Sequence, residues 1–312
     1  MEWFDDWTAC VSLCHESQSF HSRQRLIDQL RELPARTNGA PPILAANIDS
    51  VAAYVVIHPG CLCSVGGIFL PKPMRAEDAV RAGQLLNQLI EHASLETEIV
   101  QAITYAGDSN TILEACYAVA GLKKVADLNQ MECSLSVFGT DAMLSHNNKA
   151  FEDKAGKEVS VDYIAWEPSY SDFFRQLVDR TYVHTLDVPE LNGIRDSHNT
   201  LAGYAACLPP GPRPWWLLRN PNGDNIGCLL LCPYSDFAEL VYVGLVPESR
   251  GKGYAFTIMQ FAHQWALQRG LHRMVLAVDH RNEPAMKLYQ SLGYDTFGSV
   301  TAWMRSTRTA TP

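Results

Sequence analysis

Residues 241–255 read VYVGLVPESRGKGYA, an apolar strand that runs through a glycine-rich turn directly into a helix. Gly251 and Gly253 let the backbone approach a ligand closely. The first N–H groups of the following helix, together with its dipole, favour an anion such as a pyrophosphate, and Arg250 and Lys252 add positive charge. A lone Gly-x-Gly also serves as a plain strand-to-helix turn, so this stretch indicates an anion site only together with other motifs nearby.

A second pattern about thirty residues further on also occurs in the first half of the chain. In each half an Asn is followed at the same spacing by a Tyr and a Gly, and the two copies lie 172 positions apart. The matched pairs are Asn110 with Asn282, Tyr117 with Tyr289, and Gly121 with Gly293. This predicts an internal duplication. The alternative is a chance likeness between two ordinary segments of strand and helix.

The same order of elements surrounds both copies. Two strands precede a helix, a strand follows, and a second helix leads into two short strands. The expected strands are 52–57, 62–70, 99–105, 123–128 and 132–138, and then 226–232, 238–246, 274–278, 295–297 and 299–305. Polar residues without apolar periodicity separate the halves. We therefore expect an α/β (α+β) protein of two tandem domains, 1–140 and 159–312, joined by a linker over 141–158.

Both motifs of the second half resemble signatures of the GNAT (Gcn5-related N-acetyltransferase) superfamily. Arg250-x-x-Gly253-x-Ala255 is similar to its acetyl-CoA signature, and Asn282-x-x-Ala285-x-x-x-Tyr289 is similar to its second one. The resemblance covers residues 160–306 and extends weakly to the first half, an arrangement similar to mycothiol synthase. It implies in each half a mixed, mostly antiparallel sheet flanked by helices, and acetyl-CoA as co-substrate. The implied cofactor residues are Leu245, Val246, Arg250, Gly251, Lys252, Gly253, Tyr254, Ala255 and Asn282.

The resemblance also implies the catalytic residues. An alkylammonium group has a pKa of about 10.4, so a base must take its proton before it can attack a thioester. Glu239, at the start of the strand that leads to the glycine turn, is the expected base, and Tyr289 is the expected proton donor to the CoA thiolate. The alternatives are a solvent-facing strand carboxylate and a buried structural tyrosine. Asn282 is expected to contact the pantetheine arm, to cap a helix, or to do both.

The acceptor is expected to be a small-molecule or peptide amine. Asp187 and Glu190 lie between two helical segments and are candidates to hold a cationic amine, unless they only cap the next helix. Nothing in the sequence separates a polyamine, an amino sugar, an amino acid or a protein amine, and the oligomeric state is open. A non-catalytic acyl-CoA-binding regulatory protein is the alternative function.

The first half is expected to be degenerate. A shift of 172 positions places the glycine turn on residues 78–83, which lack its glycine pair and have Glu77 and Asp78 near the helix start. Carboxylates would repel a pyrophosphate there, and Pro71 and Pro73 remove two backbone donors. We therefore predict that residues 1–140 are non-catalytic.

Composition narrows the remaining classes. The chain has 25 Lys and Arg against 34 Asp and Glu, a net charge of −9, which argues against nucleic acid as a partner. The N-terminus is acidic and no apolar run is long enough to span a bilayer, so we expect a cytoplasmic protein without membrane contact. The nine cysteines match no common zinc pattern and are expected to be reduced thiols, with no metal site.

Overall fold

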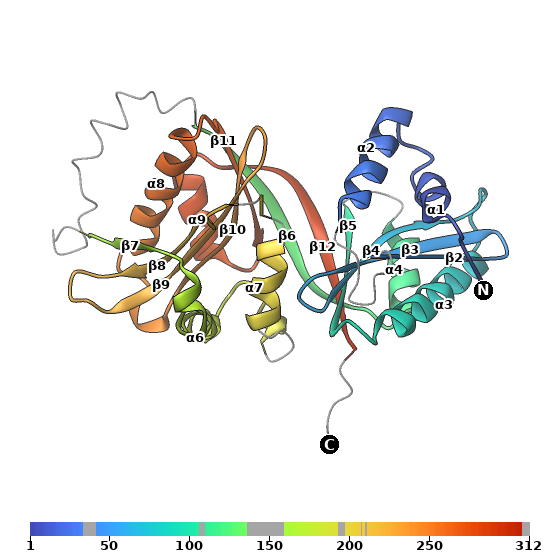
Figure 1. Cartoon of the computed structure of the whole chain (residues 1–312), viewed down its shortest axis with the longest axis horizontal. Coiled ribbons are helices and arrows are strands. Elements are labelled where there is room, and N and C mark those ends of the chain that lie inside the picture. The colour runs from blue at the N-terminus through green and yellow to red at the C-terminus, as the bar shows by residue number, and fades with distance from the viewer. Residues whose placement is uncertain are drawn as a thin grey trace, which may run out of the picture. The chain divides into compact units, whose positions relative to one another are not determined.

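The computed structural model describes residues 1–33, 42–105, 110–135, 159–192, 197–206, 208–209 and 211–307 (Figure 1). The predicted linker 141–158 lies outside these ranges. The chain forms two compact units. The first comprises Met1–Ala126, Gly193–Ala206 and Val300–Pro312, and the second comprises Asp127–Asn192 and Cys207–Ser299.

The first unit contains a mixed sheet with helices on both faces. Its strands are β1 (Glu2–Trp3), β2 (Ile43–Ile48), β3 (Val51–His58), β4 (Leu62–Phe69), β5 (Ile99–Tyr105) and the end of β12 (Asp295–Ser306), in that order across the sheet. Its helices are α1 (Trp7–Cys14), α2 (Phe20–Arg31), α3 (Ala76–Ala93), α4 (Asn110–Val119) and α7 (Ser197–Ala206). Pairing is antiparallel except between β4 and β5.

Alternation along β3 builds two apolar layers, since successive side chains of a strand point to opposite faces. Ala53, Val55 and Ile57 pack with the buried face of α3, whereas Ala52, Tyr54 and Val56 pack with α1 and α2. A strand that is buried on both faces requires helices on both sides of the sheet.

The second unit repeats this plan. Its sheet order is β6 (Lys123–Ser134), β11 (Arg273–Asp279), β10 (Ala238–Leu245), β9 (Asn225–Pro233), β8 (Trp215–Arg219) and β7 (Asp162–Ala165). Helices α8 (Tyr254–Leu267) and α9 (Glu283–Ser291) share one core with this sheet. Helix α6 (Ser171–Tyr182) packs on the opposite face, where Phe174 stacks on Trp215. Short 3-10 turns lie at Pro168–Tyr170, Pro189–Leu191 and Pro247–Ser249.

The predicted fold class is confirmed, with two differences. The expected strand pairs 123–128 with 132–138 and 295–297 with 299–305 are instead the single long strands β6 and β12. In addition, residues 128–134 of β6 pair with β11 of the second unit, and residues 300–306 of β12 pair with β5 of the first. Both differences arise from long-range pairing, which local periodicity does not report.

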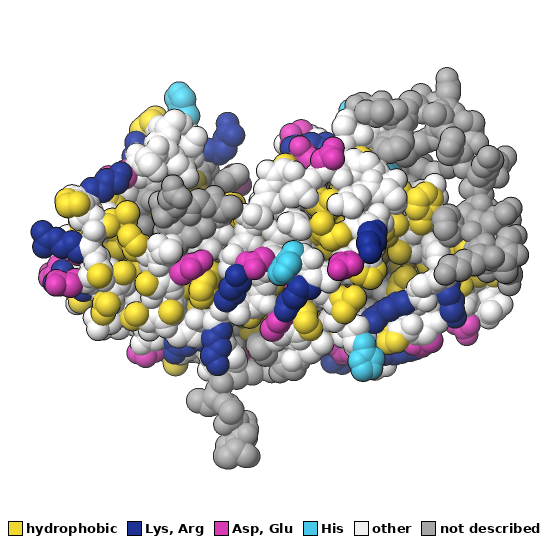
Figure 2. Space-filling view, turned by 180° about the vertical axis from the view of Figure 1, so that it is seen from behind, with side chains coloured by type: hydrophobic (Ala, Val, Ile, Leu, Met, Phe, Trp, Pro, Cys, Tyr) yellow, Lys and Arg dark blue, Asp and Glu magenta, His cyan; other side chains and the backbone are white. Residues whose placement is uncertain are grey.

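The structure locates the charged side chains and the cysteines that the composition counts. On the face shown in Figure 2, the described Lys and Arg side chains are interspersed with Asp and Glu and form no continuous basic patch. The eight cysteines of the described residues are free thiols, and these residues contain no cluster of three His, Cys, Asp or Glu that could hold a metal ion. No described helix combines the length and apolar character needed to cross a bilayer.

Candidate active site

In the second unit, β10 and β11 separate from each other and leave a wedge-shaped opening, called the wedge below. The two parallel strands pair only at three positions, Ala238–Leu240 against Met274–Leu276. Beyond a bulge at Leu240/Tyr242, β10 continues alone beside β9. A cleft of about 890 Å³ opens there, lined by β10, the turn before α8, the start of α9 and the segment after α6. Separated strand ends in a mixed sheet are a common place for a ligand.

The glycine turn presents a row of unused backbone donors. Gly251 (φ +71°) and Gly253 (φ +86°) adopt left-handed conformations, and Gly253 is the N-cap of α8. Within the described part of the chain, the N–H groups of residues 251–255 have no hydrogen-bond partner. Five consecutive free donors at a helix N-terminus form a site for an anion. The turn, Tyr254 and Ala255 line the cleft, while Lys252 is exposed beside it.

Arg250 faces the protein rather than solvent. Its Nε donates to the carbonyl oxygen of Leu245 at 3.0 Å, Nη1 to that of His184 at 2.8 Å, and Nη2 to that of Thr181 at 2.9 Å. The planar fork of arginine suits three acceptors on two segments. Arg250 therefore fixes the end of β10 against the end of α6, a role that the sequence motif alone does not reveal.

Leu245 and Val246 differ in what their backbones offer. The Val246 N–H donates to the Ile226 carbonyl at 3.0 Å, and the side chain is buried. Because N–H groups alternate between the two sides of a strand, the Leu245 N–H faces away from β9, toward the open wedge. Of the two implied cofactor residues, only Leu245 therefore has a backbone N–H that is free to bind a ligand in the wedge.

Tyr289 and Asn282 lie together along α9, and both line the cleft. Tyr289 is only 6% exposed, and its hydroxyl makes no hydrogen bond with the described residues. Burial, with a smaller contribution from the Asp187 charge, raises the pKa of Tyr289 well above its usual range, so the phenol keeps its proton at neutral pH. The Asn282 side chain caps α9 by accepting from the Ala285 N–H at 3.3 Å.

Glu239 is not among the residues that line the cleft. It lies at the start of β10, is partly buried, and accepts a hydrogen bond from the Tyr234 hydroxyl at 3.0 Å. This carboxylate could act on a molecule in the cleft only indirectly, through a bridging water.

The segment after α6 brings Asp187 into the cleft but not Glu190. Burial raises the pKa of the Asp187 carboxyl group. Glu190 instead forms a bidentate ion pair with Arg281, with N–O distances of 2.6 and 2.8 Å, which lowers the pKa of Glu190. Arg281 also binds the buried Asp279. The sequence prediction missed the ion pairs that Asp279 and Arg281 form beside the cleft. Charged residues at the end of a predicted strand could have indicated them.

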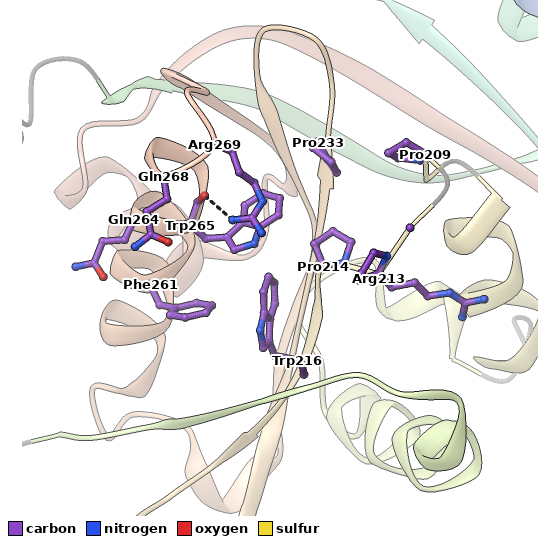
Figure 3. A pocket seen from close by; sticks show the side chains of 13 residues that line it. Pro209, Arg213, Pro214, Trp216, Pro233, Phe261, Gln264, Trp265, Gln268 and Arg269 are labelled. Atoms are coloured by element: carbon purple, nitrogen blue, oxygen red, sulfur yellow. Dashed lines mark hydrogen bonds between the residues drawn. The ribbon is translucent and has the colours of Figure 1, made fainter.

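A second cavity of about 560 Å³ lies between the C-terminal part of α8 and the ends of β8 and β9 (Figure 3). Trp216 packs edge-on against Phe261 and Trp265, and Arg269 lies over the Trp265 ring at 4.2 Å. Its described lining has prolines, glutamines and arginines but no carboxylate, histidine or thiol. Acid–base chemistry is therefore concentrated in the first cleft.

The matching helix of the first unit starts differently. Residues 78–83 lie inside α3, which begins at Ala76, so the expected equivalence of these residues with the glycine turn is wrong by more than one helical turn. The shift fails because α3 has 18 residues and α8 has 14, so that helices whose ends correspond begin at different places. Asp78, 4% exposed, accepts from the Arg75 N–H at 3.0 Å and caps the helix with its own carboxylate.

Comparisons with known proteins identify what this chain is similar to. Residues 159–294 match the model described as acetyltransferase (GNAT) family. Streptothricin acetyltransferase of Escherichia coli is 33% identical over 75 residues, 24% of this chain and 42% of that protein. Mycothiol acetyltransferase of Paenarthrobacter aurescens is 39% identical over 64 residues, 20% of this chain and 19% of that protein. The matched segments thus span less than half of either relative.

Solved structures match over nearly the whole chain. A GCN5-related N-acetyltransferase from Sphaerobacter thermophilus has a TM-score of 0.54 at 15% identity, covering 97% of this chain and 92% of that one. A tandem GNAT protein from the clavulanic acid biosynthesis pathway has a TM-score of 0.52 at 11% identity, covering 97% and 94%. Residues 159–294 are therefore similar to the acetyltransferase (GNAT) family, and the chain as a whole has the fold of a solved tandem GNAT protein.

Proposed function

We propose that this chain transfers an acetyl group from acetyl-CoA to a primary amine by direct attack in a ternary complex. The observation that carries the proposal is the row of free N–H groups at residues 251–255 beside the 890 Å³ cleft. A pyrophosphate needs such donors, and the wedge beyond Leu240 leaves room for an extended arm along β10. The GNAT match and the relatives named for acetyl transfer support the same chemistry.

Acetyl-CoA would supply an activated thioester carbonyl. The Leu245 N–H, which faces the wedge, is positioned to donate to the carbonyl oxygen. As the amine nitrogen bonds to the acetyl carbon and the C–S bond breaks, Tyr289 gives its proton to the leaving sulfur. The nitrogen passes its surplus proton to the Tyr289 oxygen, so that an amide, the CoA thiol and the restored phenol result. Glu239 is the base that the family resemblance implies, and from its position outside the cleft it would act through water. No covalent enzyme intermediate forms, so none of the cysteines is needed.

In the first unit we propose that no acetyl-CoA binds. Asp78 already supplies a carboxylate to the N-terminus of α3, and Arg81 pairs with it at 3.6 Å. A pyrophosphate would have to displace this carboxylate and meet its negative charge.

Isothermal titration of acetyl-CoA into the intact chain and into Gly253→Glu tests the proposal. We expect one binding site that the substitution removes, since it places a carboxylate in the anion site. Gly270→Glu is the matched control, because Gly270 (φ +73°) follows the other end of α8 and has open space around its Cβ position. Binding that survives in Gly253→Glu, or fails in the control, contradicts the proposal. CoA release with a panel of primary amines, streptothricin included, then separates an enzyme from a non-catalytic acyl-CoA-binding protein.

A further inference from the structure

Asp187 is the single carboxylate among the described residues that line the cleft. It forms no ion pair with the described residues. Tyr289 lines the same cleft and is close enough for the Asp187 charge to raise its pKa. A carboxylate without an ion-pair partner at the wall of a cleft attracts a cation.

Asp187 is held in place by a reciprocal pair of hydrogen bonds with the end of β11. Its Oδ1 accepts from the Asp279 N–H at 2.9 Å, while Asp279 Oδ2 accepts from the Val188 N–H at 3.2 Å. Val188 adopts φ +43°, a left-handed conformation that is strained for a β-branched residue. Such strain persists only where surrounding contacts impose it, and functional sites are where it is concentrated.

Among the described residues, Arg281 forms its ion pairs with the other two carboxylates at this place and not with Asp187. It binds the fully buried Asp279 through Nε and Nη2, at 3.0 and 2.6 Å, and binds Glu190 with both terminal nitrogens. The single positive charge of Arg281 thus offsets part of the negative charge of two carboxylates. Asp187 is left with two uncharged partners, the Asp279 N–H and the Asn282 side chain. A carboxylate has about four acceptor positions, so positions remain for a further donor.

We propose that Asp187 binds the ammonium group of the acceptor and directly takes its proton, with Asp279 and Arg281 as positioning residues. This rests on the proposed acetyl transfer and replaces Glu239 by Asp187 as the base, because Asp187 lines the cleft and Glu239 does not. One N–H proton of the ammonium passes to the carboxylate, which leaves a neutral amine and a carboxylic acid that later returns its proton to water. The acceptor class is a primary alkylamine whose remainder is uncharged, because the described cleft lining offers no second carboxylate.

Ligand-observed NMR titration with phenethylamine, 2-phenylethanol and 3-phenylpropionate tests this in the presence of CoA. We expect the intact chain to bind the ammonium form at least about tenfold more tightly than the alcohol, and the acid least. Asp187→Asn should abolish the preference, since the amide still accepts from the Asp279 N–H but carries no charge. Glu239→Gln should keep it. Glu190→Gln should weaken phenethylamine and the alcohol alike, because it loosens the segment without changing the cleft charge.

The proposal is overturned if the intact chain shows no preference for the ammonium, if Asp187→Asn keeps it, or if Glu239→Gln or Glu190→Gln loses it. Titration of acetyl-CoA into each variant keeps the two hypotheses apart. If acetyl-CoA binds with unchanged affinity while the amine preference is independent of Asp187, only the present inference fails. If acetyl-CoA does not bind the intact chain, the proposed function fails.

Discussion

Replacing Arg250 by lysine separates a structural clamp from a phosphate ligand. The family motif places a cation here, but the guanidinium donates to three carbonyl oxygens, those of Leu245, His184 and Thr181. An ammonium on a flexible stem keeps the charge and reaches one of these acceptors at a time. If Arg250 is a clamp, the substitution destabilises the second unit although the charge is kept.

The magnitude follows from the contacts. Hydrogen bonds to a charged group contribute about 1.5–3 kcal/mol each, and two are lost in the lysine variant. The bond to His184 is exposed, so water compensates part of the loss. We expect a cost of about 2–4 kcal/mol, which for a unit of this size lowers the melting temperature by about 5–15 °C.

Differential scanning calorimetry of the intact chain measures this shift, and acetyl-CoA titration at two salt concentrations measures the electrostatic contribution. Lys252→Met is the control, because Lys252 is exposed and pairs with none of the described residues. It should leave stability within about 0.5 kcal/mol but weaken acetyl-CoA binding and reduce its salt dependence. An Arg250→Lys variant with unchanged stability and weaker acetyl-CoA binding would refute the clamp.

Three further substitutions test other parts of the structure. Tyr289→Phe should lower kcat about 100-fold or more with little change in acetyl-CoA affinity, and an unchanged kcat would exclude the proton-donor role. Because burial raises the Tyr289 pKa, the intact chain should show no alkaline loss of kcat from this residue up to about pH 9. Burial lowers the pKa of His263 to about 4, so the contribution of the neutral imidazole to stability is fully present above the His263 pKa in the unfolded chain and is lost as pH falls toward 4. Urea unfolding should show that the free energy of unfolding falls by about 2–3 kcal/mol over this range. His263→Gln should reduce this dependence on pH. Asp78→Ala should cost about 1–2 kcal/mol through loss of the α3 cap, measured by thermal unfolding, without changing acetyl-CoA binding; a gain of a second binding site would show that Asp78 alone blocks the first unit.

The sequence predicted those parts of the site that are local. Gly251 and Gly253 need left-handed conformations, and Asn282 caps its helix, because neighbouring residues determine turns and caps. What the sequence did not provide is how side chains meet across the fold. Arg250 appears in a motif as a cation, and only the position of α6 shows that it faces three carbonyl groups.

The same limit applies to the fold. Strand and helix types follow from periodicity, but the partner of a strand does not. The duplication predicted that each half completes its own sheet, whereas β6 pairs with β11 and the end of β12 pairs with β5. Likewise, α7 belongs to the first unit, where Asn199 donates to Glu98 at 2.8 Å. Contacts between residues a hundred or more positions apart leave no periodic trace in either segment.

The two units contain the same wedge, which shows what distinguishes a binding site from its fold. In the first unit, β4 and β5 also pair in parallel at only three positions, Leu62–Ser64 against Ile99–Gln101, as β10 and β11 do in the second. The separation of the strands is therefore a property of the fold. The difference lies at the helix that follows. At α3 the buried Asp78 carboxylate accepts from the N–H of the N-cap residue Arg75, whereas at α8 the N–H of the N-cap residue Gly253 has no partner among the described residues. The dipole of either helix favours a negative group at its N-terminus. In the first unit Asp78 is that group, so the N-terminus of α3 needs no ligand. In the second unit the chain supplies no such group, so the N-terminus of α8 favours an anion from solution.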